Sequence, residues 1–158
     1  HHALAKLEKL GKLKAVITQN IDNFHQRAGS TNVLELHGTM EHYYCIRCRK
    51  DYDVAYVMRT KEVPRCTCGG IVRPDVVLYG EMLNTDVLDA AIKAITRADM
   101  FIIGGTSLVV YPAASLVRYY RGDKLILINR DPTAYDAWAN LVITGDISQV
   151  MASLVDGL

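Results

Sequence analysis

Two pairs of cysteines carry the strongest chemical signal in this chain: Cys45-x2-Cys48 and Cys66-x-Cys68, with seventeen residues between the pairs and no cysteine elsewhere. Four thiolates close a tetrahedron around Zn²⁺ at about 2.3 Å per bond and leave no position open for a substrate. Two disulfides, or four unrelated thiols, are the alternatives. Because both pairs lie on short, turn-like segments without the features of a secreted scaffold, we favour structural zinc and look for reaction chemistry elsewhere.

Composition indicates a globular protein with one main core. The chain has 158 residues, 50% of them hydrophobic, and a net charge of +1. The balanced charge argues against a dedicated binder of nucleic acid or of a membrane surface. The sequence contains no run of about 18 apolar residues, the pattern that predicts a membrane span. Clustered thiols without secretory features indicate a reducing, cytoplasmic setting. The sequence opens inside an amphipathic helix without an initiator Met, so we expect the natural protein to begin earlier.

Short apolar strands alternate with helices along most of the sequence. Uninterrupted apolar strands of this kind are buried on both faces, which predicts a doubly wound, Rossmann-like α/β fold with a parallel sheet. Residues 41–73 break the alternation, so we expect an inserted zinc-binding module there, within a domain formed by 1–40 and 74–158. The expected strands are 15–18, 33–36, 75–79, 100–103, 125–128 and 141–143, and the expected helices are 3–10, 22–28 capped by Asp22, 54–59, 84–97, a segment after Pro112 and a last one from Asp146.

Polar and small residues collect where these strands end. Doubly wound folds bind ligands beyond the carboxyl ends of their strands, so this edge of the sheet is the expected ligand site. The segments that follow the strands there are Thr18–Asp22, His37-Gly38, Gly104–Ser107, Asn129–Asp131 and Gly145-Asp146.

Six motifs occur in the order and approximate spacing of one known family. In these motifs the chain resembles the sirtuins, the NAD-dependent protein lysine deacylases, over nearly its whole length. We expect the family's Gly-Ala-Gly phosphate-binding turn, with its opening strand and mobile loop, to precede His1. The motifs are Gln19-Asn20-Ile21-Asp22, Leu36-His37-Gly38, the four cysteines, Val72-Arg73-Pro74-Asp75-Val76-Val77-Leu78-Tyr79-Gly80-Glu81, Gly105-Thr106-Ser107-Leu108 and Ile128-Asn129.

His37 is the candidate catalytic base, and the resemblance adds Asn20 to the catalytic set. The resemblance implies that the acyl-lysine carbonyl oxygen displaces nicotinamide from NAD, after which a base helps a ribose hydroxyl to attack. Histidine suits this task because its ordinary pKa is about 6.5. His37 ends a strand at the ligand edge, and Gly38 leaves the approach open. The alternative is a histidine satisfied by the core or by solvent, the interpretation that we keep for His25 and His42, which end no strand.

The nicotinamide end of NAD is expected at the first strand end. Asp22 and the backbone of Ile21 resemble the residues that hold the carboxamide, which needs both an acceptor and a donor. Gln19 and Asn20 would lie by the nicotinamide ribose. A simple helix cap is the alternative for Asp22.

The adenosine side of NAD is expected at the later strand ends. The Gly-Gly turn before Thr106 can approach the dinucleotide closely, although a tight turn would explain it equally well. Asn129 ends the strand where such folds hold the adenosine ribose. A helix cap is the alternative for Asp146. The expected residues on this side are Gly105, Thr106, Ser107, Asn129, Asp131, Asp146 and Ile147.

Two extended segments, 80–82 and 108–111, resemble the strands between which sirtuins hold an acyl-lysine peptide. Recognition by strand addition relies on backbone hydrogen bonds and tolerates varied sequences. Val76 resembles the residue whose backbone receives the substrate lysine amide, although an ordinary core strand is the alternative. The expected partner is an acyl-lysine protein or peptide, and the expected substrate-binding residues are Val76, Gly80, Glu81, Val109 and Val110.

Three functions from different classes fit the sequence. The first is a sirtuin-type deacylase that transfers the acyl group from lysine to ADP-ribose and releases nicotinamide. The second is a catalytically silent, zinc-stapled α/β scaffold without a complete NAD site. The third is a nicotinamide-dependent dehydrogenase with a zinc lobe, which we disfavour because the G-x-G-x-x-G spacing is absent. The resemblance puts the deacylase first.

Overall fold

Two parallel sheets form the larger part of the fold, seen in a computed structural model that describes all 158 residues. In the first sheet, β1 (Val16–Thr18) pairs with β2 (Val33–Glu35). The second holds three strands in the order β6 (Phe101–Gly104), β7 (Leu125–Asn129) and β8 (Leu141–Thr144). The central strand β7 is the most buried of the three, as expected for a strand covered on both faces.

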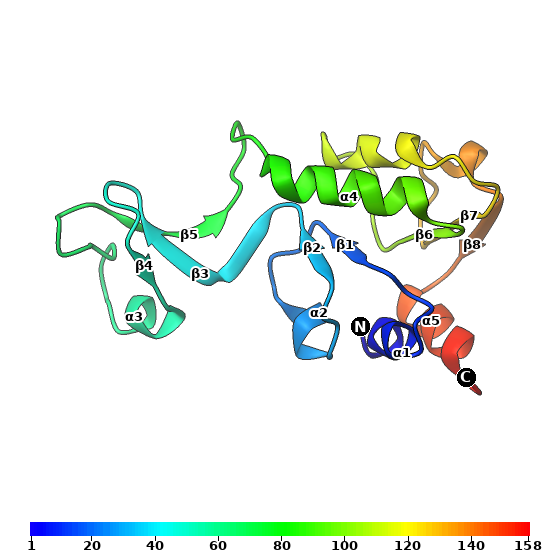
Figure 1. The fold of residues 1–158 in the computed structure, drawn as a ribbon, viewed down its shortest axis with the longest axis horizontal. Helices are drawn as coiled ribbons and strands as arrows, with labels where there is room; N and C mark the ends of the chain where they lie inside the picture. Colours follow the sequence, from blue (N-terminus) through cyan, green and yellow to red (C-terminus); the bar gives the residue numbers. More distant parts are fainter.

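Helices lie on both sides of the parallel strands, as a doubly wound fold requires (Figure 1). On one side, α4 (Thr85–Arg97) packs against β2 and against the 3-10 helix η1 (Ala113–Tyr119). On the other side, α5 (Ile147–Val155) packs against β7 and against α1 (His2–Lys9). Two short helices lie in the connections, α2 (Phe24–Arg27) and η2 (Asp136–Trp138).

The single parallel sheet expected from the sequence is divided in the structure. β1 and β6 share no backbone ladder, so the two sheets are held together by side-chain packing. Ala91 and Ile95 of α4 fill the space between Leu36, which follows β2, and Leu116 of η1. This apolar cluster fixes the position of the β2 end relative to the second sheet.

The cysteines lie in a separate antiparallel lobe, which projects from the parallel sheets at the left of Figure 1. Its long strand β3 (Gly38–Cys45) pairs with β4 (Asp51–Tyr52) on one side and with β5 (Val72–Val76) on the other. The short helix α3 (Val54–Met58) packs against β3, where the sequence predicted a helical turn.

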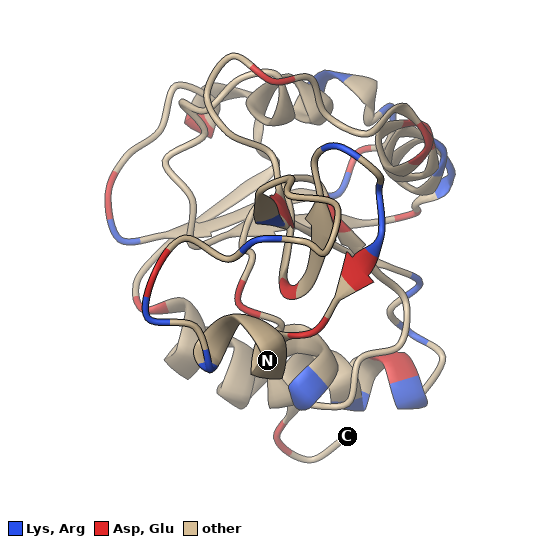
Figure 2. Ribbon diagram, turned by 90° about the vertical axis from the view of Figure 1, so that its left-hand side faces the viewer, with Lys and Arg blue, Asp and Glu red and all other residues tan.

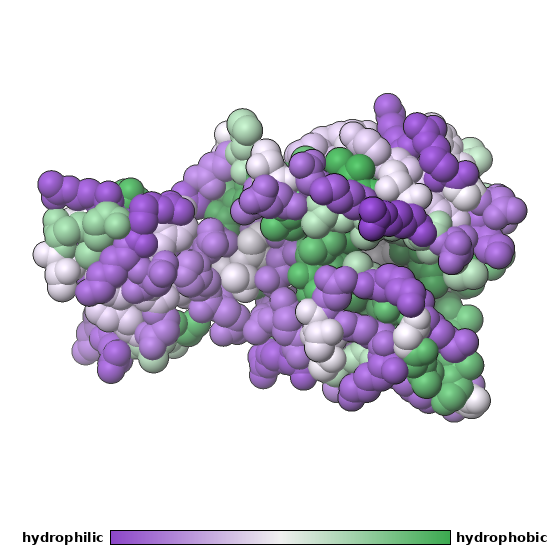
Figure 3. All heavy atoms as spheres, viewed as in Figure 1, coloured by the Kyte–Doolittle hydropathy of each residue, from purple (hydrophilic) through white to green (hydrophobic).

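The strand predicted at residues 75–79 is wrong in both position and pairing. β5 ends at Val76 and belongs to the antiparallel lobe rather than to a parallel sheet. The apolar run misled the prediction because its last residues leave the sheet: Leu78 is 56% exposed and Tyr79 is fully exposed. Figure 3 shows apolar surface near this junction between the lobe and the rest of the molecule.

Of the two predicted aspartate caps, the structure confirms the one on α5 and corrects the one on α2. Asp146 caps α5 as expected, accepting hydrogen bonds from the N–H groups of Ser148 and Gln149. The cap residue of α2 is Asn23, in a left-handed conformation with φ 60°, and not Asp22. The carboxylate of Asp22 still accepts a hydrogen bond from the N–H of Phe24 at 3.0 Å. It therefore stabilises the start of α2 from the position before the cap residue.

Charged side chains of both signs are interspersed along the chain, as Figure 2 shows. None of the helices combines the length and the apolar character that are needed to cross a membrane.

Candidate functional site

Gln19 connects the ends of three parallel strands. It follows β1, and its backbone carbonyl lies 2.9 Å from Nδ1 of His37, which follows β2. Its side-chain Oε1 accepts a hydrogen bond from Oγ1 of Thr106, beyond the end of β6, at 3.3 Å. The structure therefore brings together three of the predicted site residues, and it does so at the edge of the sheets where the sequence placed them.

The contact with Gln19 fixes the tautomer of His37. A backbone carbonyl can only accept a hydrogen bond, so Nδ1 of His37 must carry the proton and donate it. In the neutral ring the lone pair is then on Nε2. His37 is half-buried, and its Nε2 makes no hydrogen bond within the protein. A neutral histidine held in this way can accept a proton at Nε2, as a general base must.

The backbone beside His37 is fixed from the side of the cysteine lobe. The carbonyl of His37 accepts the N–H of Val77 at 2.9 Å. Gly38 has a φ of 76°, and a Cβ at this position would overlap the carbonyl of Asp75. Sequence reasoning missed Val77 because it read this residue as part of an ordinary apolar strand. The glycine directly after His37 is a local sequence signal that could have indicated such a close approach.

The segment after β1 is held by hydrogen bonds to the side chain of Thr18 and to the backbone of β3. The N–H of Asn20 bonds to Oγ1 of the buried Thr18 at 3.0 Å, and the carbonyl of Ile21 accepts the N–H of Met40 at 3.1 Å. The side chain of Asn20 is exposed and makes no hydrogen bond within the protein. The amide of Asn20 and a free oxygen of Asp22 are therefore available to a polar ligand. Their roles toward NAD stay a proposal.

A second group of predicted residues lies around the start of α5. Ile147 packs on the Gly104-Gly105 turn so closely that a Cβ on Gly104 would overlap its side chain. The Asn129 amide donates to the carbonyl of Asp131 at 2.9 Å, and the N–H of Gly145 bonds to the carbonyl of Asn129. The ends of β6, β7 and β8 thus meet around Ile147.

Asp146 forms an ion pair with Arg130 in addition to capping α5. The Arg130 guanidinium, together with the N–H groups of Ser148 and Gln149, lowers the pKa of Asp146 to about 2. Asp146 is therefore a helix cap, the alternative considered from the sequence. Its expected contact with NAD stays a proposal.

We expect Arg130→Ala to raise the pKa of Asp146 only partway toward its ordinary value of 3.8, because the two N–H donors of the helix cap remain. A carbon-detected NMR titration of the Asp146 carboxyl group measures this. The folded pKa is depressed, so the stabilising effect is present above pH 3.8 and is lost as the pH falls through about 2. An unchanged pKa in the variant would show that Arg130 contributes nothing.

The four cysteine sulfurs converge in the antiparallel lobe. All four Sγ atoms lie within 4.8 Å of one another, with Cys45–Cys68 and Cys48–Cys66 distances of 3.5 Å. These distances are too long for disulfides, at about 2.05 Å, but approach the edge of about 3.8 Å of a tetrahedron of sulfurs around zinc. The cluster fits a structural Zn²⁺.

The predicted peptide-binding segments form no regular strand. Gly80 and Glu81 lie in a turn between β5 and α4, and Val109 and Val110 lie in a loop before η1. Both valines are exposed. The side chain of Glu81 is not free, because it pairs with Arg73 at 2.6 Å. The loops present exposed apolar surface, and the carbonyl of Val76 accepts one hydrogen bond from Arg73. Their contacts with a peptide stay a proposal.

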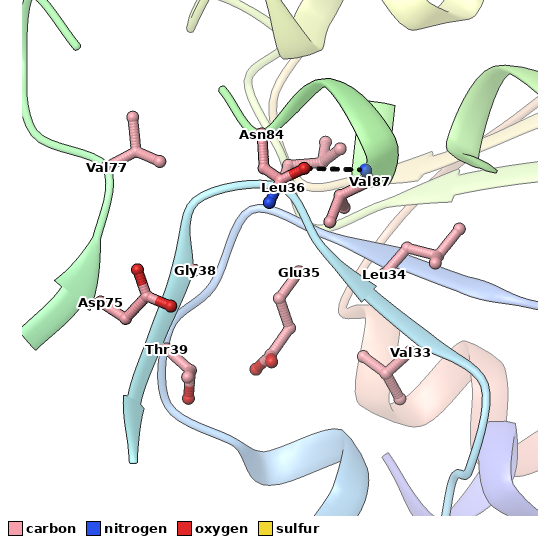
Figure 4. Close-up of a pocket in the computed structure, with 10 residues that line it drawn as sticks. All are labelled: Val33, Leu34, Glu35, Leu36, Gly38, Thr39, Asp75, Val77, Asn84 and Val87. Atoms are coloured by element: carbon pink, nitrogen blue, oxygen red, sulfur yellow. Dashed lines mark hydrogen bonds between the residues drawn. The ribbon is translucent and has the colours of Figure 1, made fainter. Parts of the chain in front are cut away.

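A cavity of about 250 Å³ lies beside the predicted site and contains none of its residues. It is open between β2, the β3–β5 pair and the start of α4 (Figure 4). The Glu35 carboxylate points into this space, where burial raises its pKa. Val77 lines the cavity, and its N–H donates a hydrogen bond to the carbonyl of His37. The cavity therefore lies next to the strand end that carries His37.

The comparison with known families agrees with these features. A family model described as the Sir2 family matches residues 1–112. The chain belongs to the Sir2 family. The NAD-dependent protein deacetylase of Clostridium tetani is 56% identical over 160 residues, a match that covers 100% of this chain and 65% of the relative. That of Clostridium perfringens is also 56% identical, with 99% and 65% covered. The chain thus spans about two thirds, at most 65%, of these Clostridium relatives' length.

Solved Sir2 structures confirm the predicted α/β fold with its four-cysteine module. A crystal structure of Sir2 with the inhibitor EX-527, 2'-O-acetyl-ADP-ribose and a deacetylated p53 peptide superposes with a TM-score of 0.91 at 46% identity, covering 98% of this chain and 69% of the other. A Sir2 homologue in complex with NAD gives a TM-score of 0.89 at 43% identity, with 99% and 62% covered. The predicted membership of the sirtuin family is confirmed.

Proposed function

We propose that this Sir2-family protein is an NAD-dependent protein lysine deacylase that transfers the acyl group from lysine to ADP-ribose and releases nicotinamide. The observation that carries the proposal is the fixed tautomer of His37 at the junction of three strand ends. Relatives named NAD-dependent protein deacetylases and Sir2 structures with NAD or acetylated peptide support the choice of cosubstrate and substrate.

The residues at the strand ends fit a dinucleotide. The exposed amide of Asn20 and the half-exposed carboxylate of Asp22 offer a donor and acceptors for a carboxamide, and the Gly104-Gly105 turn allows close approach of the backbone. NAD would supply a good leaving group and an acceptor hydroxyl. Within the protein, His37 would accept a proton at Nε2 while the Gln19 carbonyl holds Nδ1–H and stabilises the charged ring.

Zinc would hold the antiparallel lobe together without taking part in the reaction, since four thiolates complete its coordination. We further propose that residues 41–73 form a module inserted between 1–40 and 74–158. Four reduced, closely spaced thiols also suit a reducing compartment, which supports a cytoplasmic location.

Nicotinamide release tests the function against the two alternatives. The protein expressed from its complete gene is incubated with NAD and an acetyl-lysine peptide. A deacylase releases nicotinamide only when NAD and the acetyl-lysine peptide are both present. For each nicotinamide released, the peptide loses one acetyl group. NADH absorbance with no deacylation would indicate the dehydrogenase, and absence of both products would indicate the silent scaffold.

A further inference from the structure

Arg73 and Glu81 form a two-pronged ion pair across the turn that leaves the antiparallel lobe. Nη1 of Arg73 lies 2.6 Å from Oε1 of Glu81, and Nη2 lies 3.0 Å from Oε2. The Arg73 side chain is only 22% exposed and that of Glu81 is 43% exposed. Such fork-to-fork pairs fix the relative orientation of both groups.

Both members of the pair also hold the backbone of the turn. Nη2 of Arg73 donates to the carbonyl of Val76 at 2.7 Å, and Oε2 of Glu81 accepts the N–H of Leu78 at 2.9 Å. The carbonyl of Leu78 in turn accepts the N–H of Glu81 at 3.0 Å. The ion pair thus closes a ring of contacts around Val77.

Val77 connects this ring to the candidate base. Its N–H donates to the carbonyl of His37 at 2.9 Å, so the turn and His37 share one backbone bond. Leu78 and Tyr79, which follow Val77, have exposed side chains, and the N–H of Leu78 belongs to the ring. An apolar segment held in this way has little conformational freedom to lose when it binds a partner.

We propose that the Arg73–Glu81 pair is a positioning device that holds residues 76–81 ready to pair with the backbone of an acyl-lysine peptide, an inference that rests on the proposed function. Glu81 then acts through Arg73 and the Leu78 N–H rather than through its own contact with the substrate. Pre-ordering the segment lowers the entropic cost of peptide binding and leaves the NAD site unaffected.

The charge state of Glu81 suits this role over the whole physiological range. Arg73, with the Leu78 N–H, lowers the pKa of Glu81 to about 2. Because the folded pKa lies below the ordinary value of 4.5, the contacts are complete above pH 4.5 and are lost only as the pH falls through about 2. The segment should therefore stay ordered at any pH at which the enzyme works.

Two variants of Glu81 and one control test the inference in the protein expressed from its complete gene. Glu81→Ala removes both contacts, whereas Glu81→Gln keeps an oxygen that can accept the Leu78 N–H. Glu62→Ala is the control, because Glu62 is exposed and forms no ion pair or side-chain hydrogen bond. Three quantities are measured: the exchange rate of the Leu78 amide by NMR, and the Kd values of an acetyl-lysine peptide and of NAD by calorimetry.

In Glu81→Ala we expect the Leu78 amide to exchange about tenfold faster and the peptide Kd to rise about tenfold, with the Kd of NAD changed less than twofold. For Glu81→Gln, the exchange rate and the peptide Kd should lie between those of Glu81→Ala and those of the unaltered protein. For Glu62→Ala, all three quantities should match the unaltered protein. An unchanged peptide Kd in Glu81→Ala, or equal weakening for peptide and NAD, would overturn the inference. If the unaltered protein binds the peptide but does not deacylate it, the proposed function fails while this inference stands; if it does not bind the peptide, both fail.

Discussion

His37→Ala should reduce deacylation by about 10²-fold or more while the protein stays folded, since this is the scale of a positioned general base. The reason is geometric. The Gln19 carbonyl fixes the proton of the neutral ring on Nδ1, which leaves Nε2 to accept a proton, and the substitution removes this atom. NAD binding should survive better than turnover. Steady-state deacylation of an acetyl-lysine peptide, with calorimetry for NAD, measures both.

A second substitution separates the base from the hydrogen bond. In His37→Asn, the side-chain NH₂ can occupy the place of Nδ1 and keep the bond to Gln19, but an amide cannot act as a base. We expect this variant to be as inactive as His37→Ala. His2→Ala is the matched control, because His2 is exposed on α1 and makes no side-chain hydrogen bond. Peptide turnover near the unaltered rate in either His37 variant would rule out the role.

Cys48→Ser should remove zinc and unfold the antiparallel lobe. The buried core of this lobe consists of Tyr43, Cys45, Cys66 and Val72, so half of it consists of candidate metal ligands. So small a core cannot compensate for a lost ligand, and metal binding is therefore coupled to folding. Metal analysis should give one zinc per chain in the unaltered protein and much less in the variant, with a matching loss of near-ultraviolet circular dichroism.

Thr67→Ser is the control for this experiment, because it changes an exposed neighbour within the same knuckle and leaves all four thiols. It should keep both the zinc and the spectrum. A metal-free chain that keeps the spectrum of the folded lobe would contradict the structural role of zinc.

Local patterns in the sequence predicted much of this fold. The apolar run that became β7 is buried on both faces, and Asn84 and Asp146 cap the helices that were expected to begin beside them. The apolar run at 75–79 misled the prediction, because apolar residues were assumed to be buried. Leu78 and Tyr79 are instead exposed. An apolar run therefore predicts burial only for residues that stay within the sheet, and this run leaves the sheet after Val76.

The contacts that organise the site could not be predicted locally. Gln19 meets Thr106 across 87 positions of sequence, and Arg73 meets Glu81 through a turn whose shape depends on the antiparallel lobe. Residue types and strand ends placed Gln19, His37 and Thr106 on one edge, but only the tertiary structure shows that Gln19 joins them. The division of the parallel strands into two sheets is equally a matter of tertiary pairing.

The fate of the acyl group tests the central claim most directly. The protein expressed from its complete gene is incubated with NAD and a peptide whose lysine carries a ¹³C-labelled acetyl group, and the products are analysed by mass spectrometry at early times. The proposed transfer predicts labelled acetyl-ADP-ribose in a one-to-one ratio with deacetylated peptide and with nicotinamide. Labelled free acetate as the first product, formed at the same rate without NAD, would contradict it.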